Sequence, residues 1–94
     1  MRSNVRADVA KAVYDVWKDQ GQPVTVSAHD VLTWYRQEIG EITAKTMADE
    51  LYSIEDQDAP FLRVQYPDTG GELGYMGLRD IYADRLLSIA NENS

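Results

Sequence analysis

The stretch that decides the fold is residues 27–54, SAHDVLTWYRQEIGEITAKTMADELYSI. Two helical patterns of apolar residues lie in it, and only Gly40 to Ile42 separate them. Hydroxyl residues suited to cap a helix, Ser27 and Thr43, stand just before the two patterns. A link this short, with Gly at the end of the first pattern, is typical of two helices joined by a tight turn.

The apolar spacing predicts which side of each of these helices faces the core. Ser27 followed by Asp30 is close to a capping box, so the first of the two helices is expected to open there and to end at Gly40. Its inner face is expected to hold Val31, Leu32, Tyr35 and Ile39. The second helix, over residues 43–55, is expected to hold inward Ala44, Met47, Ala48, Leu51 and Ile54.

Upstream, the sequence predicts a further helix and a short strand. Ser3 or Asn4 can cap a helix that runs to about Asp19, where Gly21 and Pro23 stop it. Its inner arc is expected to hold Val5, Val9, Ala12, Val13, Val16 and Trp17. Residues 23–26 are then long enough only for a single β-strand.

Downstream, the pattern changes to strands and returns to a helix. Residues 61–66 alternate as a strand, residues 67–72 are rich in turn formers, and residues 73–78 can return as the second arm of a hairpin. A last helix is expected over residues 79–91, with a frayed end after it. One face of that helix holds Ile81, Tyr82, Leu86 and Ile89, and the other holds Ala83, Leu87 and Ala90.

Composition limits the classes of protein that fit. The chain has 94 residues, of which 44% are apolar, and this suffices for one domain spanning residues 1–94 with a single core. It has no Cys, which excludes disulfides, thiol nucleophiles and Cys-based zinc sites. No apolar run is long enough to span a membrane, so the sequence predicts a soluble, cytoplasmic protein without a membrane partner.

The chain has a negative net charge, and the types of charged residue that produce it are more informative than its size. Nine basic residues against sixteen acidic ones give −7, with only three Lys and with Asp outnumbering Glu ten to six. An Asp-rich, Lys-poor surface resembles that of proteins from organisms with molar intracellular salt, where carboxylates hold water and salt screens their repulsion. An ordinary acidic domain from another kind of organism is the alternative.

The order helix, short strand, helix, tight turn, helix, hairpin resembles a winged helix-turn-helix domain over residues 4–78. The resemblance implies an α+β fold of three helices plus a β-hairpin wing, with an extra C-terminal helix like the one many small archaeal and bacterial regulators use to dimerise. It also implies that the three residues before Ser27 pair with the hairpin. The function it implies is DNA-binding transcription regulation, and the composition favours a haloarchaeal-like source.

The resemblance makes residues 43–55 the expected recognition helix, with double-stranded DNA as the partner. Thr43, Lys45 and Thr46 lie in the first turn, where backbone amides attract phosphate, and Asp49 can select a cytosine amino group. The full set of expected DNA contacts is Arg36, Thr43, Lys45, Thr46, Asp49, Ser53, Arg63 and Gln65. Asp68 and Glu72 at the wing tip depart from the usual basic tip.

The two-faced last helix predicts a homodimer. A terminal helix that is apolar on two sides is hard to cover in a small monomer, so one side is expected to pair with a second copy. The expected interface residues are Tyr14, Tyr82, Leu86, Leu87 and Ala90. A monomer with one exposed Leu is the alternative.

The sequence does not favour an enzyme. The one His, His29, stands beside Asp30 in a helix first turn, and no nucleophile elbow, phosphate loop or metal-binding motif occurs. No metal or cofactor is expected. Two other functions for the same fold stay open: a protein-interaction module, favoured by the acidic third helix, and an acidic DNA mimic, disfavoured by nine interspersed basic residues.

Overall fold

The computed structural model describes residues 4–23, 25–57, 63–65, 75–77 and 83–93. These residues form four α-helices, three strands and a terminal 3-10 helix. The helices are α1 (Val5–Asp19), α2 (Ala28–Glu38), α3 (Ala44–Gln57), α4 (Ala83–Ala90) and the 3-10 helix η2 (Asn91–Asn93). The strands are β1 (Thr25–Ser27), β2 (Arg63–Gln65) and β3 (Tyr75–Gly77).

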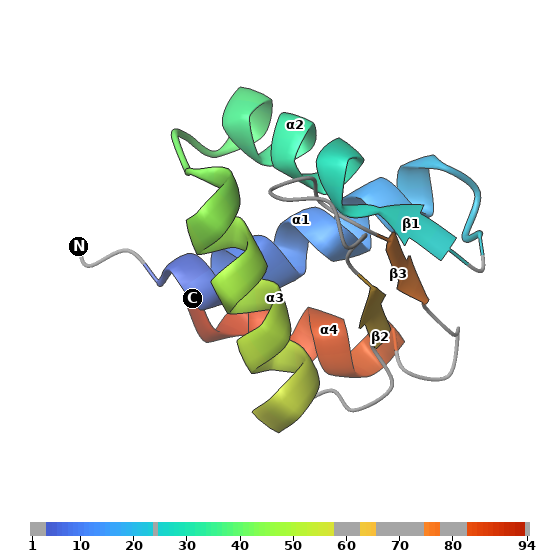
Figure 1. Cartoon of the computed structure of the whole chain (residues 1–94). Helices are drawn as coiled ribbons and strands as arrows, with labels where there is room; N and C mark the ends of the chain where they lie inside the picture. Colours follow the sequence, from blue (N-terminus) through green and yellow to red (C-terminus); the bar gives the residue numbers. More distant parts are fainter. Residues whose placement is uncertain (1–3, 24, 58–62, 66–74, 78–82, 94) are drawn as a thin grey trace.

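Helix α1 lies at the centre of the molecule and the other helices surround it. Figure 1 shows α2 above α1, α4 below it, and α3 crossing in front, with the three strands gathered below the C-terminal end of α1. The whole measures 37 × 29 × 25 Å. Because α1 is covered on three sides, it contributes more of the core than a helix on the surface of a bundle does.

The three strands form one antiparallel sheet in the order β1-β3-β2. The register places Val26, Met76 and Val64 in one row across the sheet. The predicted strand before α2 is therefore present, over Thr25–Ser27, and pairs with β3 as expected. Residues 66–74, which hold the predicted turn with Asp68 and Glu72, lie outside the described residues.

Both ends of α1 follow the sequence signals. The Asn4 side chain accepts a hydrogen bond from the Ala7 N–H at 3.2 Å, so Asn4 rather than Ser3 is the cap. The helix ends at Asp19, and Gly21 then takes a φ of 85°, in the left-handed region that glycine tolerates best. The Trp17 indole N–H donates to the Pro23 carbonyl at 3.0 Å and so ties the end of α1 to the segment before β1.

The core confirms most of the predicted inward faces. Met47, Leu51 and Ile54 of α3 are fully buried, and most inward residues of α1 and α2 are buried with them, whereas Val5, Ala44 and Ala48 are only half-buried. Residues that the apolar spacing did not place inside are also buried, among them Ala7, Ala10, Ala28 and Ile42. The prediction for Ile39 is wrong, because α2 ends at Glu38 and Ile39 is 36% exposed at its C-terminal end.

The start of α2 is only half of the predicted capping box. The Ser27 hydroxyl accepts from the His29 N–H at 3.2 Å, as an N-cap does. The Asp30 carboxylate does not complete the box. It accepts instead from the Gln20 side-chain amide at 2.9 Å, and this bond links α2 to the turn after α1.

The last helix differs from the prediction in two ways. Ala83, expected on the outer side, is buried together with Leu86 and Ile89, so α4 is apolar mainly on one face. Residues 91–93, expected to be frayed, continue as η2. The predicted beginning of this helix, including Ile81 and Tyr82, lies outside the described residues. Within the described ranges, no helix is both long and apolar enough to cross a membrane.

Candidate nucleic-acid interface

Hydrogen bonds to two backbone carbonyls fix the turn between α2 and α3. The Tyr35 carbonyl accepts from the N–H groups of both Ile39 and Gly40, at 2.8 and 3.0 Å. The Nε of Arg36 donates to the Ile42 carbonyl at 3.1 Å, and the Ile42 side chain is buried. Arg36 was expected to contact a phosphate. Its Nε instead joins the end of α2 to the turn, which holds the exposed guanidinium close to the start of α3.

Thr43 caps α3 as predicted. Its hydroxyl accepts from the Thr46 N–H at 3.1 Å and lies 2.9 Å from the Thr46 hydroxyl, while its carbonyl accepts from the Met47 N–H at 3.0 Å. Both threonine side chains are exposed. The first turn of α3 therefore presents two hydroxyls to solvent at the positive end of the helix dipole.

The outward face of α3 carries a mixed set of side chains. Lys45, Thr46, Asp49 and Tyr52 are exposed, and Ser53 is half-buried. The Lys45 ammonium lies 2.9 Å from the Asp49 carboxylate, one helical turn further on. An exposed pair of this spacing contributes only about 0.3–0.5 kcal/mol, so a phosphate can displace the carboxylate at little cost.

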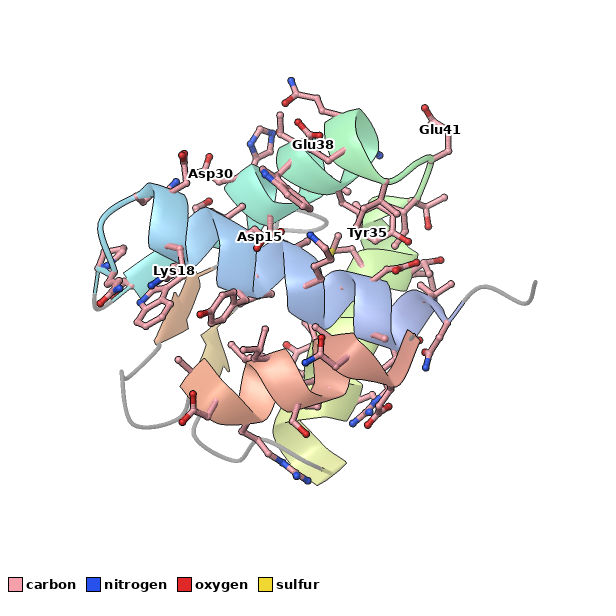
Figure 2. All side chains as sticks on the ribbon, turned by 180° about the vertical axis from the view of Figure 1, so that it is seen from behind. Asp15, Lys18, Asp30, Tyr35, Glu38 and Glu41 are labelled. Atoms are coloured by element: carbon pink, nitrogen blue, oxygen red, sulfur yellow. The ribbon has the colours of Figure 1, made fainter. Side chains whose placement is uncertain are left out.

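Acidic residues outnumber basic ones around this face. Between residues 36 and 53, Arg36 and Lys45 are opposed by four carboxylates, which gives this segment a charge of 2 − 4 = −2. The four carboxylates belong to Glu38, Glu41, Asp49 and Glu50. Figure 2 shows Glu38 at the end of α2 and Glu41 on the turn, both directed outward. The first turn of α3 is the part of this face best suited to an anion.

Tyr35 lies at the junction of α1, α2 and α3, with 4% of its surface exposed. Burial raises the pKa of its phenol above the ordinary value of 10.0, and the negative charges of Asp8 and Glu50 raise it further. The phenol therefore stays protonated in the folded protein at pH values where it would ionise in the unfolded chain.

This difference predicts a loss of stability in alkali. Below pH 10 both states hold the proton, so Tyr35 contributes no pH dependence; above pH 10 the unfolded chain loses it first, and the free energy of unfolding falls. Tyr35→Phe is expected to show a smaller fall over the same range. Urea unfolding at a series of pH values measures the difference, with Tyr14→Phe as the matched control, and an equal fall in all three proteins would contradict the assignment.

The other expected DNA contacts lie on the hairpin. Arg63 and Gln65 are in β2, where the backbone register pairs them with Gly77 and Tyr75. Their side chains lie outside the described part of the chain, as do the wing-tip residues. Five of the expected DNA contacts thus lie close to the turn between α2 and α3: Arg36, Thr43, Lys45, Thr46 and Asp49. For Arg63 and Gln65 the structure gives only the position of the backbone in β2.

The residues expected at a dimer interface are divided between core and surface. Leu86 is fully buried within the protomer, so its side chain has no surface to offer a second copy, and the prediction for it is corrected. Leu87 is 38% exposed, and Tyr14 and Ala90 are half-buried beside it. These three line a pocket of about 520 Å³ between α1 and α4. Tyr82 lies outside the described residues.

Helix α1 makes several contacts that were not predicted from the sequence. The Lys11 ammonium lies 2.6 Å from the Asp15 carboxylate and 5.2 Å from the centre of the Trp34 ring on α2. Arg6 lies 3.8 Å from Glu92 of η2. The spacing of Lys11 and Asp15, one helical turn apart, is a signal for the first pair. Nothing local in the sequence indicates the contacts with Trp34 and Glu92, because they depend on how the helices pack.

His29 is exposed in the first turn of α2, and only its backbone N–H takes part in the cap. Among the residues that the structure describes, no group of three or more His, Cys, Asp or Glu side chains is placed to hold a metal ion.

No family model, no curated protein and no solved structure matches the chain. The case for a function therefore depends on the geometry and the charge of the molecule.

Proposed function

We propose that this protein is a winged helix-turn-helix DNA-binding regulator that acts as a dimer, with α3 as its recognition helix. The observation that carries the proposal is the α2–turn–α3 unit. On one side of α3, Met47, Leu51 and Ile54 are buried in the core, and on the opposite side Lys45 and Thr46 are exposed to solvent. The order of the elements, with β1 paired to a hairpin that follows α3, supports the same fold family.

The N-terminal end of α3 is the part that would enter a major groove. The Thr43 hydroxyl donates to the Thr46 hydroxyl, the Thr46 hydroxyl can donate its own proton to phosphate, and Lys45 can reach a phosphate or the acceptor edge of guanine. Asp49 is placed to accept from a cytosine amino group, but it repels phosphates otherwise. Arg36, held by the Ile42 carbonyl, adds a cation beside the same turn.

The acidic charge of the protein determines how its affinity for DNA is expected to depend on salt concentration. The chain carries −7, so cations must be taken up to screen its carboxylates from the DNA, whereas neutralising phosphates releases cations. The two effects oppose each other. We expect binding to depend on salt weakly or in the reverse direction, which matches the Asp-rich, Lys-poor composition of proteins adapted to high salt.

The role of α3 is tested by removing one cation from it. Lys45→Ala is expected to weaken binding to a selected duplex roughly fivefold to tenfold, because Lys45 is the cation in the first turn. Arg85→Ala removes an exposed cation from α4 and is the matched control, with an expected change of less than about twofold. Fluorescence anisotropy measures both. Equal losses for the two variants would mean that α3 does not form the contact.

A second function is favoured by the charge of the same face. The local excess of carboxylates around α3 suits a basic protein better than a nucleic acid. In this alternative the protein is a winged-helix interaction module without direct DNA contact. Recovery of a stoichiometric basic partner, together with failure to select any duplex, would favour the module over the regulator.

A further inference from the structure

One side of α1 carries a strip of four charged residues, of which Lys11 and Lys18 are exposed and Asp8 and Asp15 are half-buried. They alternate in sign at helical spacing, so they lie on one side of α1 within about 80° of each other. Figure 2 shows this side of the molecule, with Asp15 and Lys18 along α1, α2 above and α4 below. We call these four residues the α1 strip.

The α1 strip is neutral in a chain that carries −7. Its two positive and two negative charges cancel, whereas the segment between residues 36 and 53 sums to −2. A surface that pairs with an identical acidic surface must avoid like-charge contact, because like charges set opposite each other cost several kcal/mol. A neutral strip is thus the kind of surface on which two copies of this chain can approach.

The order of the charges is more specific than their sum. Positions equally distant from Val13 carry opposite signs: Asp8 mirrors Lys18, and Lys11 mirrors Asp15. A two-fold axis through an antiparallel pair of α1 helices relates each position to its mirror position on the other copy. Every charge of the strip then faces an opposite charge.

We infer that two copies of this protein pair through the strip sides of antiparallel α1 helices, with the two-fold axis crossing at the level of Val13 along the helix. Asp8 meets Lys18 of the second copy, and Lys11 meets Asp15 of the second copy, each pair occurring twice. Sliding one helix by a turn in either direction would set Lys11 against Lys11 or Asp15 against Asp15. The charge order therefore selects a single register.

The surroundings of the α1 strip supply apolar contact. Leu87 is 38% exposed on the α4 side, and Trp34 is half-buried on the α2 side under the Lys11 ammonium. The pocket of about 520 Å³ between α1 and α4 lies beside Asp8 and Tyr14 and leaves room for the stem of Lys18 of the second copy. Both flanks are needed, because a single helix face is smaller than a standard interface of about 1,200 Å².

This inference specifies the dimer of the proposed function, and it is tested by mass measurement without DNA, so that its failure leaves DNA binding separately testable. Sedimentation equilibrium is run for the wild type, Lys11→Glu/Lys18→Glu and Asp8→Lys/Asp15→Lys, from low to molar KCl. The wild type is expected to be a dimer. Each double variant sets like charges against each other and is expected to raise the dimer Kd roughly a hundredfold at low KCl, with a smaller rise in molar KCl because salt screens the repulsion.

Mixing the two double variants is the decisive experiment, because a strip of four negative charges on one copy then faces a strip of four positive charges on the other. The mixture is expected to form a heterodimer, and the fully inverted variant Asp8→Lys/Lys11→Asp/Asp15→Lys/Lys18→Asp is expected to return to a homodimer. Glu38→Lys/Asp49→Lys makes the same charge change away from the strip and should stay dimeric. Circular dichroism checks that each variant folds. A monomeric wild type, a dimer that survives both reversals, or a mixture that stays monomeric would overturn the inference.

Discussion

Replacing Leu51 by Ala is expected to lower the free energy of unfolding by about 2–5 kcal/mol. Leu51 is fully buried on the inner side of α3, between Met47 and Ile54, where α3 packs against α1. The loss has two parts: the apolar surface that the side chain no longer buries, and the cavity that surrounding residues only partly fill. The total free energy of unfolding of a small domain is about 5–15 kcal/mol, so this one change removes a large share of the stability.

Urea unfolding followed by circular dichroism measures the loss. Lys45→Ala on the outer side of the same helix is the control, with an expected cost below about 0.5 kcal/mol because the Lys45 side chain is 86% exposed. If Leu51→Ala does not fold, Leu51→Val gives a smaller loss that is still measurable. A cost for Leu51→Ala no larger than that for Lys45→Ala would mean that α3 is not packed by its Met47, Leu51 and Ile54 face.

Reversing two carboxylates of α3, in Asp49→Lys/Glu50→Lys, is expected to tighten binding to a selected duplex roughly a hundredfold at low salt. The change adds one cation at exposed position 49 on the outward face of α3, and a second at half-buried position 50 on the side of α3 nearer Tyr35. It also frees the Lys45 ammonium from the Asp49 carboxylate that lies 2.9 Å away. The reversed protein is expected to show a steeper loss of affinity with salt than the wild type, because it makes more phosphate contacts.

The control for this reversal is Asp19→Lys/Asp84→Lys. It makes the same change of charge at exposed positions on α1 and α4, so it separates a general charge effect from a contact made by α3. An equal gain in both double variants would mean that binding responds to net charge alone. Unchanged DNA binding, combined with loss of a basic protein partner, would favour the interaction module over the regulator.

The helices could be predicted from sequence because their signals are local. Asn4, Ser27 and Thr43 cap helices as their side chains suggest, and Gly21 takes the positive φ that its position after α1 requires. The capping box failed at Asp30 because a partner from another segment, the Gln20 amide, offered a competing hydrogen bond. Such competition depends on tertiary packing, which local spacing does not encode.

The candidate site was predictable as a set of positions but not as a set of interactions. The outward positions of α3 follow from its apolar spacing, and Lys45, Thr46 and Asp49 are exposed as expected. The pairing of Arg36 with the Ile42 carbonyl was not predictable, since Ile42 lies in an irregular turn. The two-faced reading of the last helix is confirmed for Leu87, which is 38% exposed, and is wrong for Ala83, which packs into the core.

The most direct test of the central claim, that α3 of this acidic protein reads DNA, is selection of duplexes from a random library followed by affinity measurement from low to molar KCl. We predict that one sequence is enriched, and that its affinity changes little or rises as KCl increases. Failure to enrich any duplex at any salt concentration, or a steep fall in affinity with rising salt, would contradict the account.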